Sequence, residues 1–245
     1  MAKSTKKTTK KRTSRKPAPA PQRLWRRALR WGLRGAAGFA GVLVFWIMLY
    51  VVINPPTTPY MLAESWRLGG IEHEWVDLED IDPVMARAAV AAEDANFCLH
   101  WGFDMAAIRQ ALEGGANRGA STITQQVVKN VFLWQGRSWP RKALEALMTP
   151  VVELFWTKRR ILEVYLNVVE MGEGRFGVEA AARGYFRVGA GELSPTQAAR
   201  IAAILPDPKD RNAANPTAFL RRRAAAILDG AATIRADGRA TCFED

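Results

Sequence analysis

The chain has 245 residues and a formal net charge of +11, but this charge is unevenly distributed. Residues 1–34 hold 13 of the 35 Lys and Arg residues and no acidic residue, which leaves 22 basic and 24 acidic residues in the remainder. The main body of the chain is therefore almost neutral. This argues against a nucleic-acid-binding protein, because such a protein carries a basic patch on its folded surface.

Residues 35–53 form an apolar run that contains no charged side chain. As a helix, a run of this length would rise by about 28 Å, enough to cross the hydrocarbon core of a membrane. A buried core helix and a cleaved signal peptide are the alternatives. The run is longer than a usual signal-peptide core, and the proline-rich residues 54–59 follow it in place of a cleavage site. We therefore expect an uncleaved transmembrane anchor.

The distribution of basic residues predicts how this anchor is oriented. Positively charged flanks stay on the cytoplasmic side of a membrane, so residues 1–34 should form a cytoplasmic tail. This tail should be largely disordered, because Lys, Thr, Ser, Pro and Ala cannot build a core. Residues 54–80 have no clear period and are expected to connect the anchor to an external domain over residues 81–245.

The external domain is expected to be mostly α-helical, since alternating strand patterns are scarce in it. Asp82 precedes a proline and is a candidate N-cap residue. Asp104 should cap a second helix, which should stop at Gly114-Gly115.

Four further helices are expected downstream. The longest should begin at Trp139-Pro140 and run to about Glu170, with a kink near Pro150. The starts of the other three are expected at Ser121 or Thr122, at Ser194, which opens a capping box, and at Asn215-Pro216, with the last helix ending near Arg235.

Residues 93–104 (EDANFCLHWGFD) are the most informative stretch of the chain. Two carboxylates, Glu93 and Asp94, stand side by side, and an aromatic residue, a histidine and a third carboxylate follow. Adjacent like charges repel each other, so one of such a pair is either solvated or held for a purpose. Glu93 is therefore the first candidate for acid–base chemistry.

Residues 119–130 (GASTITQQVVKN) place hydroxyl and amide side chains at the start of a helix, with Lys129 one to two turns later. Amides at a helix N-terminus, together with a lysine, can bind an anion. An ordinary capped helix with polar exposed residues explains the segment equally well, and both interpretations stay open. Downstream, Arg141, Lys142 and Glu145 can share one helix face, which taken alone is a routine surface ion pair.

Two other patterns carry less weight. Gly172, Gly174 and Gly177 have the spacing of a dinucleotide-binding fingerprint, but that fingerprint needs a preceding strand, where we expect a helix. His73 and His100 make a weak pair of metal ligands, because no cysteine cluster accompanies them.

The only two cysteines are Cys98 and Cys242. They could pair in an oxidising compartment, but one distant pair does not imply a disulfide framework. We therefore expect free thiols.

The order of the segments is more specific than any one of them, and together they resemble the family-51 glycosyltransferases. These are peptidoglycan polymerases, also found as the first domain of class A penicillin-binding proteins. The family patterns E-D-x-x-F-x-x-H-x-G-x-D, G-x-S-T-I-T-Q-Q-x-x-K-N, R-K-x-x-E and K-x-x-I-L-E-x-Y-L-N are met at residues 93–104, 119–130, 141–145 and 158–167. The resemblance covers about residues 60–230, and the stretch 167–186 is similar to the stand-alone members.

The resemblance implies a lysozyme-like helical lobe beside a membrane-associated lobe, preceded here by one transmembrane helix. It implies lipid II and the growing glycan strand as substrates, contact with membrane lipid, and a catalytic domain in the periplasm of a single-pass inner-membrane protein. Proteins of cell-wall synthesis or division are possible partners. No cofactor is required by the sequence, which shows no complete set of metal ligands, although a divalent cation could assist.

The resemblance also implies roles for individual residues. Glu93 would be the catalytic base that activates a sugar hydroxyl, and Glu145 a second catalytic carboxylate near the leaving group. The residues expected to bind substrate are Asp94, Phe97, His100, Ser121, Thr122, Gln125, Gln126, Lys129, Asn130, Arg141 and Lys142.

Two other functions remain open. A lytic hydrolase could also use a single glutamate in a lysozyme-like domain, although the basic side chains and the glutamine-rich second segment argue against it. A non-catalytic membrane scaffold would fit the tail and anchor, but it would leave the catalytic segments without a use.

Overall fold

The structure is a computed structural model that describes residues 21–114, 121–136 and 138–244. The chain divides into two compact units, one ending at Phe45 and the other beginning at Trp46, and each is described by itself. The predicted disorder of residues 1–20 and the stop at Gly115 lie outside the described residues.

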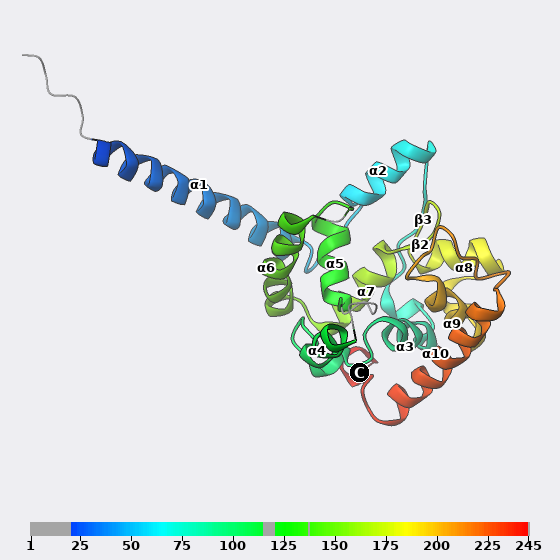
Figure 1. Ribbon diagram of the computed structural model, residues 1–245. Coiled ribbons are helices and arrows are strands. Elements are labelled where there is room, and N and C mark those ends of the chain that lie inside the picture. Colours follow the sequence, from blue (N-terminus) through cyan, green and yellow to red (C-terminus); the bar gives the residue numbers. More distant parts are fainter. Residues whose placement is uncertain (1–20, 115–120, 137, 245) are drawn as a thin grey trace, which may run out of the picture. The chain divides into compact units, whose positions relative to one another are not determined.

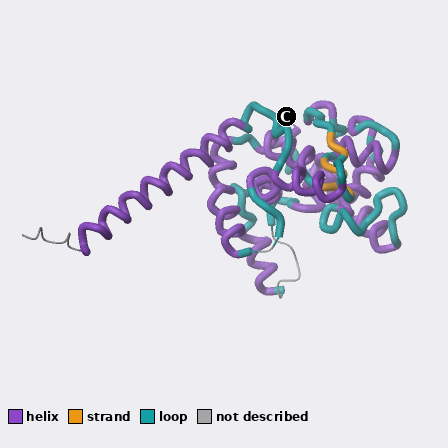
Figure 2. The backbone as a smooth tube through the Cα atoms, turned by 90° about the horizontal axis from the view of Figure 1, so that it is seen from above, coloured by secondary structure: helices purple, strands orange, loops and turns teal. Residues whose placement is uncertain are grey.

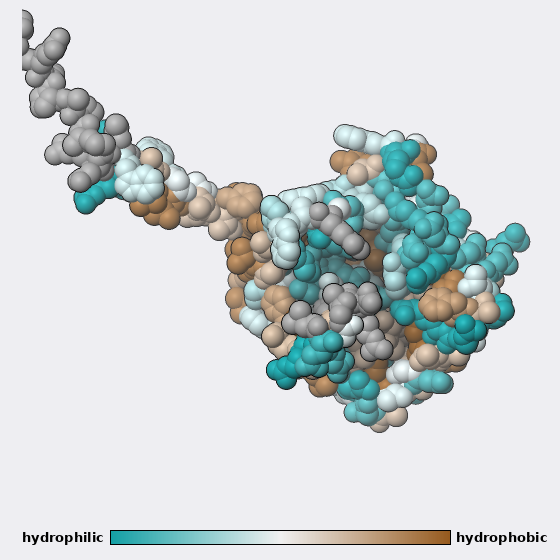
Figure 3. All heavy atoms as spheres, in the orientation of Figure 1, coloured by the Kyte–Doolittle hydropathy of each residue, from teal (hydrophilic) through white to brown (hydrophobic). Residues whose placement is uncertain are grey.

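Helix α1 (Pro21–Leu49) supplies the first unit and reaches into the start of the second (Figure 1). Its stretch Trp25–Leu49 is long and apolar enough to cross a membrane, and almost all of it is exposed. Figure 3 shows the apolar side chains gathered along this helix. The helix begins well before the predicted residue 35, within the expected tail, and ends at Leu49 instead of Ile53.

The second unit is built mainly from helices, with short strands between them (Figures 1 and 2). The prediction of a mostly α fold is therefore confirmed. Its helices are α2 (Pro59–Leu68), α3 (Pro83–Glu93), α4 (Met105–Glu113), α5 (Ile123–Phe132), α6 (Trp139–Phe155), α7 (Lys158–Val168), α8 (Val178–Phe186), α9 (Pro195–Ile204), α10 (Ala218–Ala236) and α11 (Thr241–Glu244). Single 3-10 turns lie at Leu78–Asp80, Phe97–Leu99 and Ala190–Glu192.

The core of this unit consists of two groups of helices. Helices α3, α9 and α10 pack against one another, and α5 packs against α6 and α7. The facing side chains are apolar and almost completely buried, as for Val90 in α3, Val128 in α5 and Ile201 in α9. Burial of this kind is the main favourable term in folding. It also fixes the C-terminal end of α3 and the N-terminal end of α5, on which the candidate site is built.

The expected helix starts are largely confirmed, because local side-chain caps decide them. Asp82 accepts a hydrogen bond from the backbone N–H of Val84, and Asp104 accepts one from Ala107. Thr122 and Ser194 each begin a helix with a complete capping box. The last long helix starts at Thr217, slightly later than expected.

The long helix expected from Trp139 to Glu170 is wrong as a single element. Helix α6 continues through Pro150 and ends at Phe155, where Trp156 takes an extended conformation and its indole N–H donates to the carbonyl of Ile47 at 2.9 Å. Thr157 then caps α7 by accepting from the N–H of Arg160. The break therefore comes from a distant contact and a new cap.

Residues expected to end this helix form part of a small sheet in the order β1-β3-β2. Strands β1 (Glu72–His73) and β3 (Arg175–Phe176) are parallel, and β2 (Glu170–Gly172) runs antiparallel to β3. The glycines of the suspected dinucleotide fingerprint belong to this hairpin and its exit. Gly177, with φ +84°, lies so close to the backbone of Asn167 that a Cβ there would approach its carbonyl oxygen to 2.7 Å.

The expectation of free thiols is also wrong, because Cys98 and Cys242 form a disulfide. They are 144 residues apart, and their Cα atoms are 5.6 Å apart. The short helix α11 brings Cys242 back against the 3-10 turn that contains Cys98. Tertiary structure, which sequence spacing does not show, therefore decides the pairing.

Candidate active site

Glu93 is the last residue of α3, and its side chain is only 13 % exposed. The Gln126 side-chain amide donates to its Oε2 atom at 2.9 Å, and the Arg223 guanidinium lies 3.9 Å from its Oε1 atom. Burial raises the pKa of Glu93 above its ordinary value, although Gln126, Arg223 and Lys129 oppose this shift. A carboxylate with a raised pKa can accept a proton from a weakly acidic hydroxyl more readily than a fully solvated one.

Asp94 links the first two sequence segments. Its Oδ1 atom lies 2.8 Å from Nε2 of His100, and its Oδ2 atom accepts the backbone N–H of Ile123, the first residue of α5, at 3.0 Å. The carboxylate therefore uses both oxygens within the protein. Asp94 and His100 fix the end of α3 relative to the start of α5, which places Glu93 beside Gln126.

The start of α5 is held by a second set of contacts. The Thr122 hydroxyl donates to the carbonyl of Gly102 at 2.8 Å, and it also accepts the N–H of Gln125. Gly102 has φ +82°, and a Cβ there would lie 2.6 Å from the side chain of Thr149. The glycine of the first segment is thus required by a close approach to α6 and by its backbone conformation.

Nine residues line a cavity of about 400 Å³ next to this helix start. Most come from the second and third predicted segments: Ser121, Gln125, Gln126, Lys129, Gln135, Gly136, Arg141, Lys142 and Glu145. Three of these described residues are cationic and one is a carboxylate, which leaves a net charge of about +2 when all are ionised. Such a cavity favours an anion with more than one negative charge.

The single carboxylate of this cavity orients two of the cations. Arg141 donates from Nη1 to Glu145 at 2.7 Å and from Nε to the carbonyl of Gly136 at 2.9 Å. Lys142 forms an ion pair with the other oxygen of Glu145, and its side chain is 42 % exposed. The three residues that sequence spacing predicts to pair therefore form one wall of the cavity. In this wall Arg141 is fixed and Lys142 is accessible from solvent.

Lys129 faces the same cavity from α5. Burial lowers the pKa of Lys129, and the nearby cations Arg141 and Lys142 lower it further, while Glu145 and Glu93 act in the opposite direction. A lysine crowded by other cations gains when an anion binds beside it, since the anion relieves both burial and repulsion.

The cavity around Glu93 is smaller, at about 180 Å³, and it adjoins the basic cavity. Ser121 lines both cavities. Gln126 also connects them, because it lines the basic cavity while its amide donates to Glu93. A ligand that spans both cavities would meet acidic side chains, among them Glu93, at one end and three cations at the other.

Two of the expected substrate-binding residues lie in the core instead of on the cavity walls. Phe97 is 0 % exposed, and the Lys158 Nζ atom lies 4.4 Å from the centre of its ring. Asn130 is buried, and its side-chain oxygen accepts the amide of Gln135 at 3.1 Å. Both side chains support the site from behind and present almost no surface to a ligand.

Arg223 of α10 is a site residue that the sequence segments do not reveal. It lies within the final helix, far from every segment that carried the prediction, and its neighbours Arg221 and Arg222 are also basic. Among the described residues, its buried Nε atom has no hydrogen-bond partner. Only the packing of α10 against α3 shows that this arginine, of the three, lies close to Glu93.

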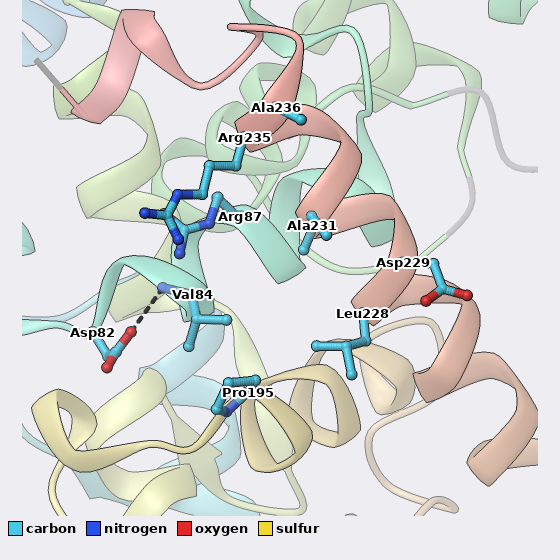
Figure 4. A pocket seen from close by; sticks show the side chains of 10 residues that line it. Asp82, Val84, Arg87, Pro195, Leu228, Asp229, Ala231, Arg235 and Ala236 are labelled. Atoms are coloured by element: carbon cyan, nitrogen blue, oxygen red, sulfur yellow. Dashed lines mark hydrogen bonds between the residues drawn. The ribbon is translucent and has the colours of Figure 1, made fainter.

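Another cavity, of about 630 Å³, lies elsewhere, between α3, α10 and the start of α9. Figure 4 shows apolar side chains along its walls, with Arg87 and Arg235 at one end and Asp229 at the other. It contains none of the predicted site residues. In the parts of the chain that the structure describes, no group of three or more His, Cys, Asp or Glu side chains could hold a metal ion.

Comparison with known proteins gives the family of this chain. The model of a family described as transglycosylase matches residues 62–232. A protein of Jannaschia sp. (strain CCS1), named biosynthetic peptidoglycan transglycosylase, is 59 % identical over 90 % of this chain and 93 % of its own length. Proteins with the same name from Xanthomonas campestris pv. campestris (strain B100) and Caulobacter vibrioides (strain ATCC 19089 / CIP 103742 / CB 15) are 47 % and 45 % identical, over 84 % and 80 % of this chain and 89 % and 87 % of their own lengths. This chain therefore belongs to the transglycosylase family.

Proposed function

We propose that this protein polymerises lipid II, the undecaprenyl-pyrophosphoryl disaccharide-pentapeptide, with Glu93 as the general base. Family membership and the names of the relatives support a peptidoglycan glycosyltransferase that builds glycan strands for the cell wall. The observation that carries the mechanism is the adjacency of a buried carboxylate and a cation-lined cavity.

In the proposed reaction, the 4-hydroxyl of one saccharide attacks C1 of another. The hydroxyl loses its proton to the Glu93 carboxylate, the new bond forms with inversion at C1, and the bond from C1 to the lipid pyrophosphate breaks. General-base assistance of this kind is typically worth about 10²–10⁴-fold in rate. Gln126 donates to one oxygen of Glu93, and the other oxygen, 3.9 Å from Arg223 and thus beyond hydrogen-bond distance, can accept from the acceptor sugar.

Negative charge builds up on the departing pyrophosphate, and the basic cavity is suited to stabilise it. Arg141 is held in place by Glu145 and by the carbonyl of Gly136, Lys129 lines the cavity from α5, and Lys142 is accessible from solvent. Preorganised charges of this kind act where charge develops and need little reorganisation during the reaction. In this scheme, Glu145 keeps Arg141 and Lys142 oriented toward the leaving group.

The anchor gives this chemistry access to a lipid-linked substrate. We propose that α1 crosses the inner membrane once, with the basic tail in the cytoplasm and the catalytic domain in the periplasm. Exposed apolar side chains on α2 and α6 support contact of the domain with lipid, since Trp66 is 80 % exposed and Trp139 is 88 % exposed. The domain would then bind both the growing strand and membrane lipid, and proteins of cell-wall synthesis or division could join them.

The test is to follow fluorescently labelled lipid II and, separately, preformed uncrosslinked glycan strands with the full-length protein. We expect lipid II to be converted into long strands and the preformed strands to stay intact. Shortening of the strands would instead favour a lytic hydrolase, and no change in either substrate would favour a non-catalytic scaffold.

A further inference from the structure

The C-terminal segment, residues 237–244, folds back onto the loop that follows Glu93 and Asp94. We call residues 237–244 the strap and residues 95–99 the catalytic loop. The disulfide joins Cys98 of the loop to Cys242 of the strap. Arg239 of the strap donates to the carbonyl of Ala95 at 3.0 Å. The rings of Phe243 and Phe97 pack with their centres 6.4 Å apart, and both are almost completely buried.

The strap is itself fastened to the helices that carry the site. Glu244 forms an ion pair with Arg87 of α3, the helix that ends at Glu93. Arg159 of α7 donates to the carbonyl of Phe243 at 3.1 Å. The strap therefore connects α3, α7 and the catalytic loop.

The loop that the strap holds is also part of the wall around Glu93. Ala95 and Asn96 line the smaller cavity together with Glu93. Within the loop, Asn96 donates to Asp104 at 2.9 Å, and the residues that flank the loop, Asp94 and His100, pair with each other. The strap holds the loop as well, and the disulfide is the covalent attachment between the two.

We infer that the strap is a positioning element for Glu93, and that the Cys98–Cys242 bond makes the rate of polymerisation depend on the thiol redox state. This inference rests on the proposed role of Glu93. Releasing the loop would move the base relative to the acceptor hydroxyl, and small errors in the alignment of reacting groups are costly. The cations of the other cavity do not contact the strap, so donor binding should change little.

The redox step can be written with an ordinary dithiol as the reductant. One thiolate of the reductant attacks a sulfur of the disulfide, and its second thiol then resolves the mixed disulfide. The products are the thiols of Cys98 and Cys242 and the oxidised, cyclic reductant. The two electrons therefore come from the dithiol, and oxidation in the periplasm would reverse the step.

The chain has only two cysteines, so a reductant acts on this bond alone. We would measure kcat and KM for lipid II with the oxidised protein, with the dithiothreitol-reduced protein, and with the Cys98→Ser/Cys242→Ser double variant in both conditions. Reduction should lower kcat by roughly three- to tenfold with KM within about twofold, because the base acts mainly in the transition state. The double variant should match the reduced protein and should not respond to dithiothreitol.

A second variant leaves the disulfide intact, so that a change in its kcat does not come from a general loss of stability caused by removing the disulfide. Arg239→Ala removes the hydrogen bond to Ala95 and should also lower kcat selectively. Its matched control is Arg211→Ala, which removes a similar bond from an arginine to the carbonyl of Ala203 at 3.3 Å, away from strap and loop. The control should keep its kcat, and circular dichroism should show all variants folded at the assay temperature.

An unchanged kcat in the reduced protein and in Arg239→Ala would overturn the inference, as would an equal loss in Arg211→Ala. A rise in KM with constant kcat would also contradict it, because donor binding would then be the affected step. Glu93→Gln in the same assay separates the two proposals. If that variant is inactive while reduction has no effect, only the role of the strap is wrong, whereas an active Glu93→Gln variant refutes the role of Glu93 itself.

Discussion

At the scale of single residues, the two candidate catalytic carboxylates have opposite surroundings. Glu93 is buried with one amide donor and a cation at 3.9 Å, and its pKa is raised. Glu145 accepts from Arg141 at 2.7 Å and from Lys142. Environments that differ in this way commonly separate a proton acceptor from a charge that orients other groups. The structure therefore supports Glu93 as the base and Glu145 as the orienting residue.

The acid side of the pH–rate profile should report the ionisation of Glu93. Burial raises its pKa, and Arg223 and Lys129 lower it, while the neighbouring Asp94 raises it. Activity needs the ionised form and is lost as the pH falls through this raised pKa. Arg223→Gln removes a cation that favours the ionised form, so the acid limb of kcat/KM should move to higher pH. A limb that stays in place or moves to lower pH would contradict the role of Arg223.

Lys129 should show a conflict between stability and activity. Burial lowers its pKa, so its positive charge destabilises the native state at every pH below that lowered pKa. This destabilisation disappears as the pH rises from the pKa of Lys129 in the native state to its higher pKa in the unfolded state. Lys129→Met should therefore raise Tm at neutral pH, with a smaller gain at alkaline pH, while kcat falls by about 10²–10³-fold. Thermal unfolding at both pH values checks the sign, and a lower Tm at neutral pH would contradict it.

At the scale of elements, the site depends on how the end of α3 meets the start of α5. Asp94 makes this connection through His100 and the N–H of Ile123. Helix α5 in turn carries Gln126 and Lys129, which both line the basic cavity, and the amide of Gln126 also donates to Glu93. A change at Asp94 should therefore affect both stability and catalysis.

Asp94→Ala leaves the buried N–H of Ile123 without its acceptor, which typically costs about 1–3 kcal/mol. For a domain of this size we expect Tm to fall by about 2–4 °C for each kcal/mol, together with a clear loss of kcat. Asp94→Asn keeps an acceptor and should be milder in both respects. Asp82→Ala removes a comparable helix cap far from the site and should lower Tm with kcat unchanged. Equal kcat in the Asp94 and Asp82 variants would show that Asp94 has no positioning role.

The elements also show what the sequence can and cannot predict. Helix starts at Asp82, Asp104 and Thr122 follow from side chains that cap their own helix, so local sequence is sufficient. The end of α6 follows from a bond between Trp156 and Ile47, more than one hundred residues apart, and no local pattern reveals it. The strand pairing of β1 with β3 was missed for the same reason.

The candidate site likewise combines residues that local sequence predicts with residues that only tertiary packing brings together. Glu93, Lys129 and Glu145 could be found because each lies in a contiguous segment whose order matches the family. Arg223 and the disulfide were missed, because they reach the site only through the packing of α10 and α11. The buried positions of Phe97 and Asn130 also depend on that packing.

At the scale of the whole molecule, the boundary between the two units lies inside α1. The last turn of this helix belongs to the globular unit. Ile47 is buried and accepts the indole of Trp156, Trp46 packs edge-on against Phe132 at 5.4 Å, and Arg160 donates to the carbonyl of Tyr50 at 3.1 Å. The C-terminal end of α1 is therefore part of the core of the globular unit.

Two truncated proteins would test this boundary. A fragment of residues 46–245 should fold and should polymerise lipid II in detergent micelles, since it keeps these contacts. A fragment of residues 55–245 loses them and should unfold at a temperature several degrees lower, about 2–4 °C for each kcal/mol lost. Equal Tm values for the two fragments would show that residues 46–54 add nothing to the globular unit.

The most direct test of the catalytic proposal is polymerisation of labelled lipid II by wild type and by Glu93→Gln, with Glu113→Gln as the control. Glu113 is an exposed glutamate of α4, so the control makes the same chemical change outside the site. We expect Glu93→Gln to keep its fold by circular dichroism and to lose about 10²–10⁴-fold in kcat, while Glu113→Gln polymerises normally. Near-normal polymerisation by folded Glu93→Gln would contradict the role of Glu93 as the base.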